Sequence, residues 1–317
     1  MLRQLVGSLP VPQDEDIIVG LQNAEDAVVY RLDEDRALVA SLDVITPVVD
    51  DPATYGKIAA SNSLSDIFAM GGKGLMSLSF LSVSKSVPPD VAVEIVRGGA
   101  EAAMDNGSPL LGGHSVEGED VLFGLLALGL VHPDELFTNH SLEVGDQLIL
   151  TKPLGTGTLT TAVKRDLLGQ EALREAVAGM VQTNGAAVDP LRGHGVRAVT
   201  DVTGFSLLGH AAEMAKASQV RVLFEQDLVA EYPGARESLA SGTVTRANGR
   251  NQAYVEHLGP LVGEPEALLL DPQTSGGLLA AVKPDQVDSL LADLREQGYT
   301  EVARVGEVVE GSGITVQ

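Results

Sequence analysis

Cysteine and tryptophan are absent from this 317-residue chain, and only 3% of its residues are aromatic. Without a thiol, the chain can form no disulfide, no thiolate zinc site and no cysteine nucleophile. Long apolar runs are also missing, because the longest, residues 121–131, is far shorter than the roughly 20 residues that span a bilayer. Met1 leads into an amphipathic stretch without an apolar signal region. We therefore expect a soluble, cytoplasmic protein with no membrane partner.

Positive charge is scarce as well. The chain has 21 Lys and Arg against 44 Asp and Glu, a formal net charge of −23. A protein that binds nucleic acid needs a basic surface, and no cluster of Lys and Arg occurs here, so we expect no nucleic-acid partner. The excess of carboxylates provides oxygen ligands for hard cations, although a generally acidic surface explains most of it.

The order of predicted elements indicates a mixed α/β or α+β protein, because strands alternate with helices. Predicted strands are 27–32, 37–42, 75–83, 121–131, 147–151, 197–200, 220–224 and 278–282. Predicted helices are 54–70, 90–106, 156–168, 171–194, 207–217 and 285–297. The length is ample for two cores. The polar segment 132–146 marks the predicted boundary between an N-terminal domain, 1–135, and a C-terminal domain, 136–317.

Four aspartates form the main candidate site. Asp26 directly precedes a predicted strand, and Asp43 and Asp201 each follow one. Asp66 is the only charged residue between Lys57 and Lys73 on a predicted helix, so we interpret its face as turned toward a site. Carboxylates at strand ends share one edge of a sheet, and they repel each other unless a cation neutralises them. The pattern of four predicts Mg²⁺ completed by substrate phosphates, whereas any one of these residues alone is more typical of a turn or a helix cap.

Three glycine-containing segments give weaker signals. In "LLGGHSVEG", 110–118, the glycines and His114 could approach an anion, and a tight turn is the alternative. "KPLGTGTLTTA" matches no phosphate-loop pattern and predicts a turn into a helix capped by Thr156. "DPQTSGGLLAAV" predicts only a turn before a strand. His210 and His257 lack an i,i+4 metal partner, and we interpret both as structural.

Five segments in order resemble one enzyme family, selenophosphate synthetase (selenide, water dikinase), within the superfamily of aminoimidazole ribonucleotide synthetase. They are "YGKIAASNSLSDIFAMGG", "LLGGHS", "LTKPLGTGTLTTA", "TDVTGFSLLGHAAEM" and "LLDPQTSGGLL". The resemblance covers nearly the whole chain. It implies a two-domain α+β and α/β fold, in which an N-terminal sheet pairs across a homodimer into a barrel and a C-terminal α/β sandwich follows.

The resemblance also implies an activity and a set of site residues. The family makes selenophosphate from hydrogen selenide, ATP and water, and releases AMP and phosphate. Its cofactors are ATP and Mg²⁺, and K⁺ is a further candidate cation. Carried over, the Mg²⁺ ligands fall on Asp26, Asp66, Asp201 and Asp43. The nucleotide contacts fall on Asn23, Ala24, Glu25, Asp43 and Asp66, together with Gly113, His114 and Ser115 from the partner subunit.

One departure from the family concerns its N-terminal segment, which carries a reactive Cys or selenocysteine followed by a Lys. Here there is no Cys, and no Lys precedes Lys57, so no catalytic residue is assigned. We expect a shortened or late-started chain that, as printed, binds ATP with Mg²⁺ but makes no selenophosphate. One alternative is a nucleotide-binding relative that acts as a regulatory or binding protein. Another is a thiamine monophosphate kinase-like or hydrogenase-maturation enzyme, which the "DPQTSGGLL" turn argues against.

Overall fold

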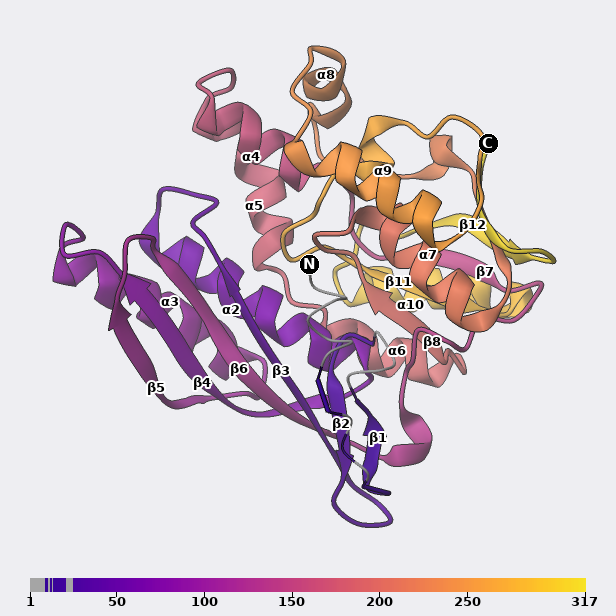
Figure 1. Ribbon diagram of the computed structural model, residues 1–317, viewed down its shortest axis with the longest axis horizontal. Helices are drawn as coiled ribbons and strands as arrows, with labels where there is room; N and C mark the ends of the chain where they lie inside the picture. Colours follow the sequence, from indigo (N-terminus) through magenta and orange to yellow (C-terminus); the bar gives the residue numbers. More distant parts are fainter. Residues whose placement is uncertain (1–8, 11, 13, 21–24) are drawn as a thin grey trace.

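The computed structural model describes residues 9–10, 12, 14–20 and 25–317. They form two sheets with helices packed against each (Figure 1). The last strand of the first sheet by sequence is β6 (Leu122–Val131), and the second sheet begins with β7 (Gln147–Leu150). The predicted mixture of helices and strands in two sheets is thereby confirmed. Within the described part of the chain, no helix has both the length and the apolar character needed to cross a membrane.

The N-terminal sheet has six strands in the order β1-β2-β3-β6-β4-β5. Strands β4 and β5 are parallel and are joined through a helix, whereas every other pair is antiparallel. Its other elements are β1 (Ile17–Val19), β2 (Val28–Arg31), β3 (Ala37–Ile45), β4 (Lys73–Val83), β5 (Leu110–Glu117), and helices α2 (Pro52–Ala69) and α3 (Pro89–Asp105). The segment Gly113–Ser115 lies inside β5, so the alternative of a tight turn there is wrong.

Helices α2 and α3 lie together on one face of this sheet (Figure 1). The other face carries the apolar pair Leu42 and Leu126, which lie opposite each other on β3 and β6, and Phe80 opposite His114 on β4 and β5. Leu42 is 63% exposed. Among the described residues nothing covers this surface, which we call the open sheet face.

Helix α2 begins at a well-formed cap and is buried on almost every side. Asp51 accepts a hydrogen bond from the backbone N–H of Thr54 over 2.8 Å. The face that carries Asp66 is not broadly exposed, because Asn62 and Met70 on the same face are only 5% and 0% exposed. Of residues 61–70, only Asp66 is not fully buried. Beyond Lys57, helix α2 has no Lys or Glu chiefly because this stretch packs against the C-terminal half, and within residues 61–70 Asp66 alone reaches partly open space.

The C-terminal sheet has seven strands in the order β10-β13-β9-β12-β7-β11-β8. Its other strands are β8 (Ala198–Asp201), β9 (Arg221–Phe224), β10 (Leu261–Val262), β11 (Leu278–Val282), β12 (Ala303–Val309) and β13 (Gly313–Val316). The helices are α4 (Thr156–Lys164), α5 (Arg174–Val181), α6 (Val188–Gly193), α7 (Ser206–Ser218), α8 (Ala235–Ala240), α9 (Arg246–Leu258) and α10 (Val287–Glu296). Short 3-10 turns lie at Pro133–Glu135, Gln170–Leu173, Gly185–Ala187, Gln226–Leu228, Ala267–Leu270 and Pro284–Gln286.

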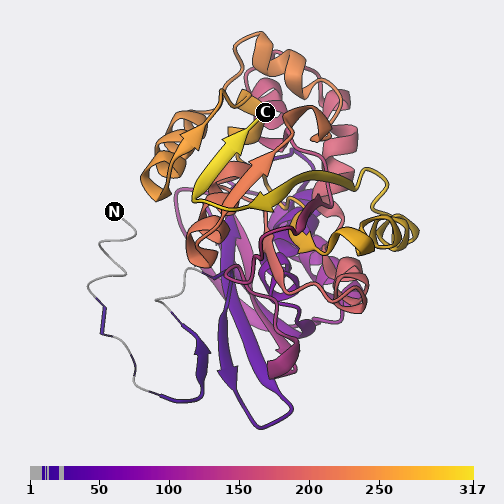
Figure 2. The ribbon, with the colours of Figure 1, turned by 90° about the vertical axis from the view of Figure 1, so that its right-hand side faces the viewer.

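Strand β11 is buried along its whole length because helices cover both faces of the C-terminal sheet. Leu278 belongs to a core that includes side chains of α6 and α10, and Leu279 to a core with side chains of α4 and α7. The first of these cores also contains Ile67 and Phe68 of α2. The two halves therefore share one apolar core, and the long strands of the N-terminal sheet project below the C-terminal half (Figure 2).

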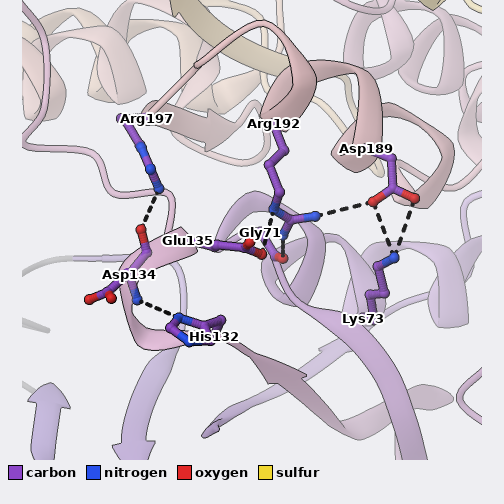
Figure 3. Close-up of polar contacts among 8 residues, drawn as sticks. All are labelled: Gly71, Lys73, His132, Asp134, Glu135, Asp189, Arg192 and Arg197. Carbon is purple, nitrogen blue, oxygen red and sulfur yellow. Dashed lines mark hydrogen bonds and ion pairs between the residues drawn. The ribbon is translucent and has the colours of Figure 1, made fainter. Parts of the chain in front are cut away.

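Polar contacts reinforce this junction (Figure 3). Arg192 of α6 donates to the backbone carbonyl of Gly71, just after α2, and forms an ion pair with Glu135 at 3.1 Å. Asp189, also in α6, pairs with Lys73 of β4 at 3.2 Å. Charged groups from both halves thus meet at the end of α2.

The cap of α4 comes from the distant "DPQTSGG" segment and not from Thr156, contrary to the prediction. The side-chain oxygen of Gln273 accepts from the backbone N–H groups of Gly155 and Thr156 over 3.0 and 3.1 Å. Asp271 accepts from the N–H of Thr158 over 3.1 Å. A motif that predicted only a turn therefore satisfies the N-terminal donors of a helix more than 100 residues earlier.

Candidate functional site

The four predicted aspartates come from both halves of the chain and influence one another electrostatically. Asp26 precedes β2, Asp43 lies in β3, Asp66 in α2, and Asp201 ends β8. Burial raises the pKa of Asp66 well above its ordinary value, and the charges of Asp201, Asp43 and Asp26 raise it further. Burial also raises the pKa of Asp43 to about 6, with Asp201 adding to the rise. These four residues form the acidic cluster.

Hydrogen bonds fix three of these carboxylates. Asp26 accepts from the hydroxyl of Thr200 over 3.0 Å, and Asp43 accepts from the amide of Asn62 over 2.9 Å. The hydroxyl of Ser41 donates to Asp66. Each contact leaves carboxylate lone pairs unused, so the cluster retains the capacity to bind a further group.

Within the acidic cluster, two buried carboxylate oxygens lack any hydrogen-bond partner, Oδ2 of Asp26 and Oδ2 of Asp201. Burial raises the pKa of Asp26 well above its ordinary value, and the charge of Asp201 contributes. An orphaned carboxylate oxygen in such a cluster fits a hard cation, which would supply the missing partner.

The aspartates fit a cation site that is completed by ligands from outside the protein better than one formed by protein side chains alone. No group of three or more His, Asp or Glu side chains in the described part of the chain could already hold a metal ion by itself. Mg²⁺ suits such a set, because it usually takes one or two carboxylates and completes its shell with water and phosphate oxygens. To hold Mg²⁺, the carboxylates of the acidic cluster would therefore need further oxygen ligands, such as water or phosphate.

A buried lysine, which the motif analysis did not single out, balances part of this charge. Lys152 follows β7, is 2% exposed, and donates to the carbonyls of Gln182 and Ser275 over 2.6 and 3.0 Å. Burial lowers the pKa of Lys152 to about 7, and the charge of Asp201 opposes that shift. The sequence signal was a lysine directly after a buried strand, where an unpaired charge is costly.

The "DPQTSGG" segment also supports the acidic cluster. The amide of Asn62 donates to Asp43 and, through its oxygen, accepts from the backbone N–H of Ser275 over 2.9 Å. Asn184 donates to Ser65 of α2 and to the carbonyl of Gly276, each over 2.9 Å. This turn of the C-terminal half therefore contacts α2 through hydrogen bonds next to the aspartates.

The predicted nucleotide segment before Asp26 is only partly described. Asn23 and Ala24 lie outside the described residues. The side chain of Glu25 is 1% exposed, and it accepts from the N–H of Asn139 over 2.8 Å and contacts the ring of His140 at 2.7 Å. Glu25 therefore ties the start of the N-terminal sheet to the segment that joins the two sheets.

The structure does not bring Gly113, His114 and Ser115 to the acidic cluster of the same chain. They lie in edge strand β5, and Gly113 and His114 line a hollow of about 330 Å³ on the open sheet face. None of the four aspartates lines this hollow. Another hollow, of about 410 Å³, lies beside Lys152 in the C-terminal half and likewise contains none of them. The predicted role of Gly113–Ser115 therefore requires a second copy of the chain.

Comparisons with known proteins cover both halves. Residues 24–131 match the family model "AIR synthase related protein, N-terminal domain", and residues 143–317 match "AIR synthase related protein, C-terminal domain". Among solved structures, thiamine-monophosphate kinase from Stenotrophomonas maltophilia is similar with a TM-score of 0.69 at 19% identity, covering 96% of this chain and 92% of that one. A chain of the HypE–HypF complex gives 0.75 at 14% identity, covering 100% and 95%. At these identities the structures show the fold alone, and they confirm the predicted two-domain architecture.

Two relatives by sequence carry the same name. The chain is 41% identical over 304 residues to "Selenide, water dikinase" of Burkholderia pseudomallei, covering 94% of this chain and 85% of that protein. It is 40% identical over 314 residues to the protein of the same name from Clostridioides difficile, covering 98% and 90%. This chain therefore belongs to the selenide, water dikinase family.

Proposed function

We propose that this protein synthesises selenophosphate from hydrogen selenide, ATP and water, and releases AMP and phosphate. The observation that carries the proposal is the acidic cluster with its two orphaned carboxylate oxygens, in a chain about 40% identical along nearly its whole length to selenide, water dikinases. A buried set of carboxylates with unused lone pairs is suited to hold a cation against the phosphates of ATP.

The residues of the acidic cluster would hold Mg²⁺ together with the phosphates. Bound there, Mg²⁺ would neutralise charge that develops on the transferring phosphoryl group. Asp26 and Asp201 offer their free oxygens to this cation, and Thr200 and Asn62 hold Asp26 and Asp43 in place. We propose the same site for K⁺ only as a further cation beside Mg²⁺.

The nucleotide contacts and the dimer form the second part of the proposal. Asn23, Ala24 and Glu25 would contact ATP from the chain that holds the acidic cluster. Gly113, His114 and Ser115 would contact it from the partner subunit, because their strand borders the open sheet face. Burying that face against a second copy would remove exposed apolar groups such as Leu42 from water and close the two sheets into a barrel.

A nucleotide-binding relative without synthetase activity is the competing reading. The names of the relatives favour the enzyme, and so does the retention of all four aspartates in this chain. The proposal therefore replaces the expectation that the printed chain makes no selenophosphate.

Phosphorus NMR of the protein with ATP, Mg²⁺ and selenide under anaerobic conditions tests the proposal. We expect a selenophosphate signal together with AMP and phosphate. Asp66→Asn is the control, because it keeps the size of the side chain and removes one charge from the acidic cluster. ATP binding without any turnover would instead identify a nucleotide-binding relative.

A further inference from the structure

Three side chains beside the acidic cluster form a chain of polar contacts. The hydroxyl of Thr203 lies 3.3 Å from Nε2 of His210, and Nδ1 of the same ring lies 3.4 Å from a carboxylate oxygen of Glu213. A hydroxyl, an imidazole and a carboxylate in this order are the arrangement that moves a proton from hydroxyl to imidazole while the carboxylate orients the ring. Contacts of this length are common in unliganded catalytic sites and shorten when substrate binds.

Surrounding residues hold this arrangement in position. The hydroxyl of Tyr254 donates to the second oxygen of Glu213. The ring of Phe205 packs edge-on against His210 at 5.7 Å between centroids and stacks on Tyr254 at 4.8 Å. The backbone N–H of Ser206 donates to the carbonyl of Thr203 over 3.0 Å, and Ser206 has a left-handed φ of 70°. A non-glycine residue in that conformation is costly and is found mostly where the surrounding structure requires it.

The arrangement has an open end and a buried end. Thr203 is half-buried, whereas His210 is only 6% exposed, so the hydroxyl is the group that a bound molecule can reach. Thr203 follows Asp201 by two positions, in the turn between β8 and α7. The charge of His210 lowers the pKa of Asp201 against the effect of burial, which agrees with His210 lying close to the acidic cluster.

We propose that Thr203, His210 and Glu213 form a proton relay for the water that cleaves the second phosphoanhydride bond. This proposal rests on the proposed function, in which ATP ends as AMP. The two phosphoryl acceptors differ in their need for a base. Hydroselenide is already an anion at neutral pH, whereas water must lose a proton as it attacks. A relay beside the phosphates therefore serves the hydrolytic step.

The step balances without any further reagent. The oxygen of water forms a bond to the β-phosphorus of ADP, and the bond from that phosphorus to the oxygen bridging the α-phosphate breaks. The electron pair of the broken bond stays on the α-phosphate, which leaves AMP and phosphate. The proton of water passes to the Thr203 oxygen while the Thr203 proton passes to Nε2 of His210. Glu213 is the positioning residue, because it holds Nδ1 and stabilises the imidazolium.

The test compares Thr203→Val with Thr203→Ser in the full chain. Phosphorus NMR with ATP, Mg²⁺ and selenide resolves ADP, AMP, phosphate and selenophosphate. In Thr203→Val we expect consumption of ATP to stay within about threefold of wild type, because the first transfer needs no relay. We expect AMP formation to fall by about 10²-fold or more, so that ADP accumulates. Thr203→Ser keeps the hydroxyl and should restore AMP formation.

Further variants distinguish loss of the relay from a folding defect. His210→Gln should also accumulate ADP, and Glu213→Gln should do so more weakly. His257→Gln, which alters an exposed histidine of α9, should behave as wild type. An unchanged ratio of ADP to AMP in both Thr203→Val and His210→Gln overturns the relay. So does an equal defect in Thr203→Val and Thr203→Ser, because that result indicates a packing role.

The two proposals fail in different ways in this experiment. A wild-type protein that converts ATP to AMP without a selenophosphate signal contradicts the proposed function and leaves the ratio of ADP to AMP readable in the variants. A wild-type protein that makes selenophosphate and AMP, with the same ratio of ADP to AMP in Thr203→Val and His210→Gln, contradicts the relay alone. A wild-type protein with no turnover contradicts both.

Discussion

The hydroxyl of Thr200 donates a hydrogen bond to Asp26 over 3.0 Å, although 174 positions separate the two residues. Thr200 belongs to β8 of the C-terminal sheet, and Asp26 lies two residues before β2 of the N-terminal sheet. Asp26 therefore belongs to the N-terminal half, but its carboxylate is held in position by the C-terminal half. The acidic cluster exists only while the two halves are packed together.

Replacing Asp66 should separate binding from stability. We expect Asp66→Asn to abolish Mg²⁺-dependent binding of ATP, because the variant removes one charge from the acidic cluster. In metal-free buffer the same variant should be more stable than wild type by about 1 kcal/mol or more, because one source of buried repulsion is gone. Titration calorimetry with ATP and Mg²⁺ measures the first effect, and urea denaturation in EDTA measures the second. Unchanged ATP affinity, or a loss of helical circular dichroism, would contradict the assignment.

The metal-free protein should lose stability as the pH rises from about 4 to about 6, that is, from the ordinary pKa of an aspartate to the folded pKa of Asp43. The pKa values of Asp66 and Asp43 are raised in the folded protein, the latter to about 6, so the folded state binds more protons than the unfolded state in this window. Stability is then gained as the pH falls through the folded pKa values and lost as it rises through them. Thermal unfolding in EDTA across this range checks the sign.

A histidine outside the acidic cluster also makes stability fall as the pH rises, so its contribution needs a control. The hydrogen bond to Asp293 raises the pKa of His194, so its contribution is present at low pH and is also lost as the pH rises. His194→Gln removes this contribution and should leave most of the slope. Asp66→Asn should reduce the slope without abolishing it, because burial also raises the pKa of Asp43 to about 6 and that of Asp271 to about 7. Saturating Mg²⁺ and ATP should weaken the slope too, because the cation favours the ionised carboxylates. A flat profile for wild-type protein in EDTA would contradict the charge coupling.

The contacts of Arg192 should stabilise the junction between the halves. Arg192 is 22% exposed on its side chain and engages Gly71 and Glu135, so we expect Arg192→Met to lower the free energy of unfolding by about 2 kcal/mol. Its matched control is Lys73→Met, since Lys73 is 69% exposed and its ion pair should contribute under about 1 kcal/mol. Urea denaturation measures both. Equal effects of the two variants would show that the junction does not depend on Arg192.

The open sheet face should be the surface of association. We expect wild-type protein to sediment as a dimer at micromolar concentration and Leu42→Arg to sediment as a monomer, because Leu42 is 63% exposed on that face. Val93→Arg is the control, since Val93 is 61% exposed on α3 and away from the face. The monomeric variant should also bind ATP more weakly, because Gly113–Ser115 would no longer reach the nucleotide of a second copy. Full ATP affinity in the monomer would contradict that arrangement.

The sequence alone determined much of this protein. The alternation of strands and helices predicted the mixed fold, and Asp66 stood out because no other charge lies near it on its helix. The five ordered segments by themselves indicated the family. These signals were readable because periodicity, charge and motif order are local properties of the chain.

Only the tertiary structure decided which distant groups meet. Strand β5 was missed because its glycines read as a turn, and its pairing with β4 depends on a strand about 30 residues away in sequence. The cap of α4 by Gln273, the burial of Lys152 and the contact of Thr203 with His210 likewise depend on how loops close around packed elements. Periodicity reports which face of an element is apolar, but the partner of that face is fixed by the docking of two cores. Residues such as Thr200 and Asp26 therefore meet only once that docking is complete.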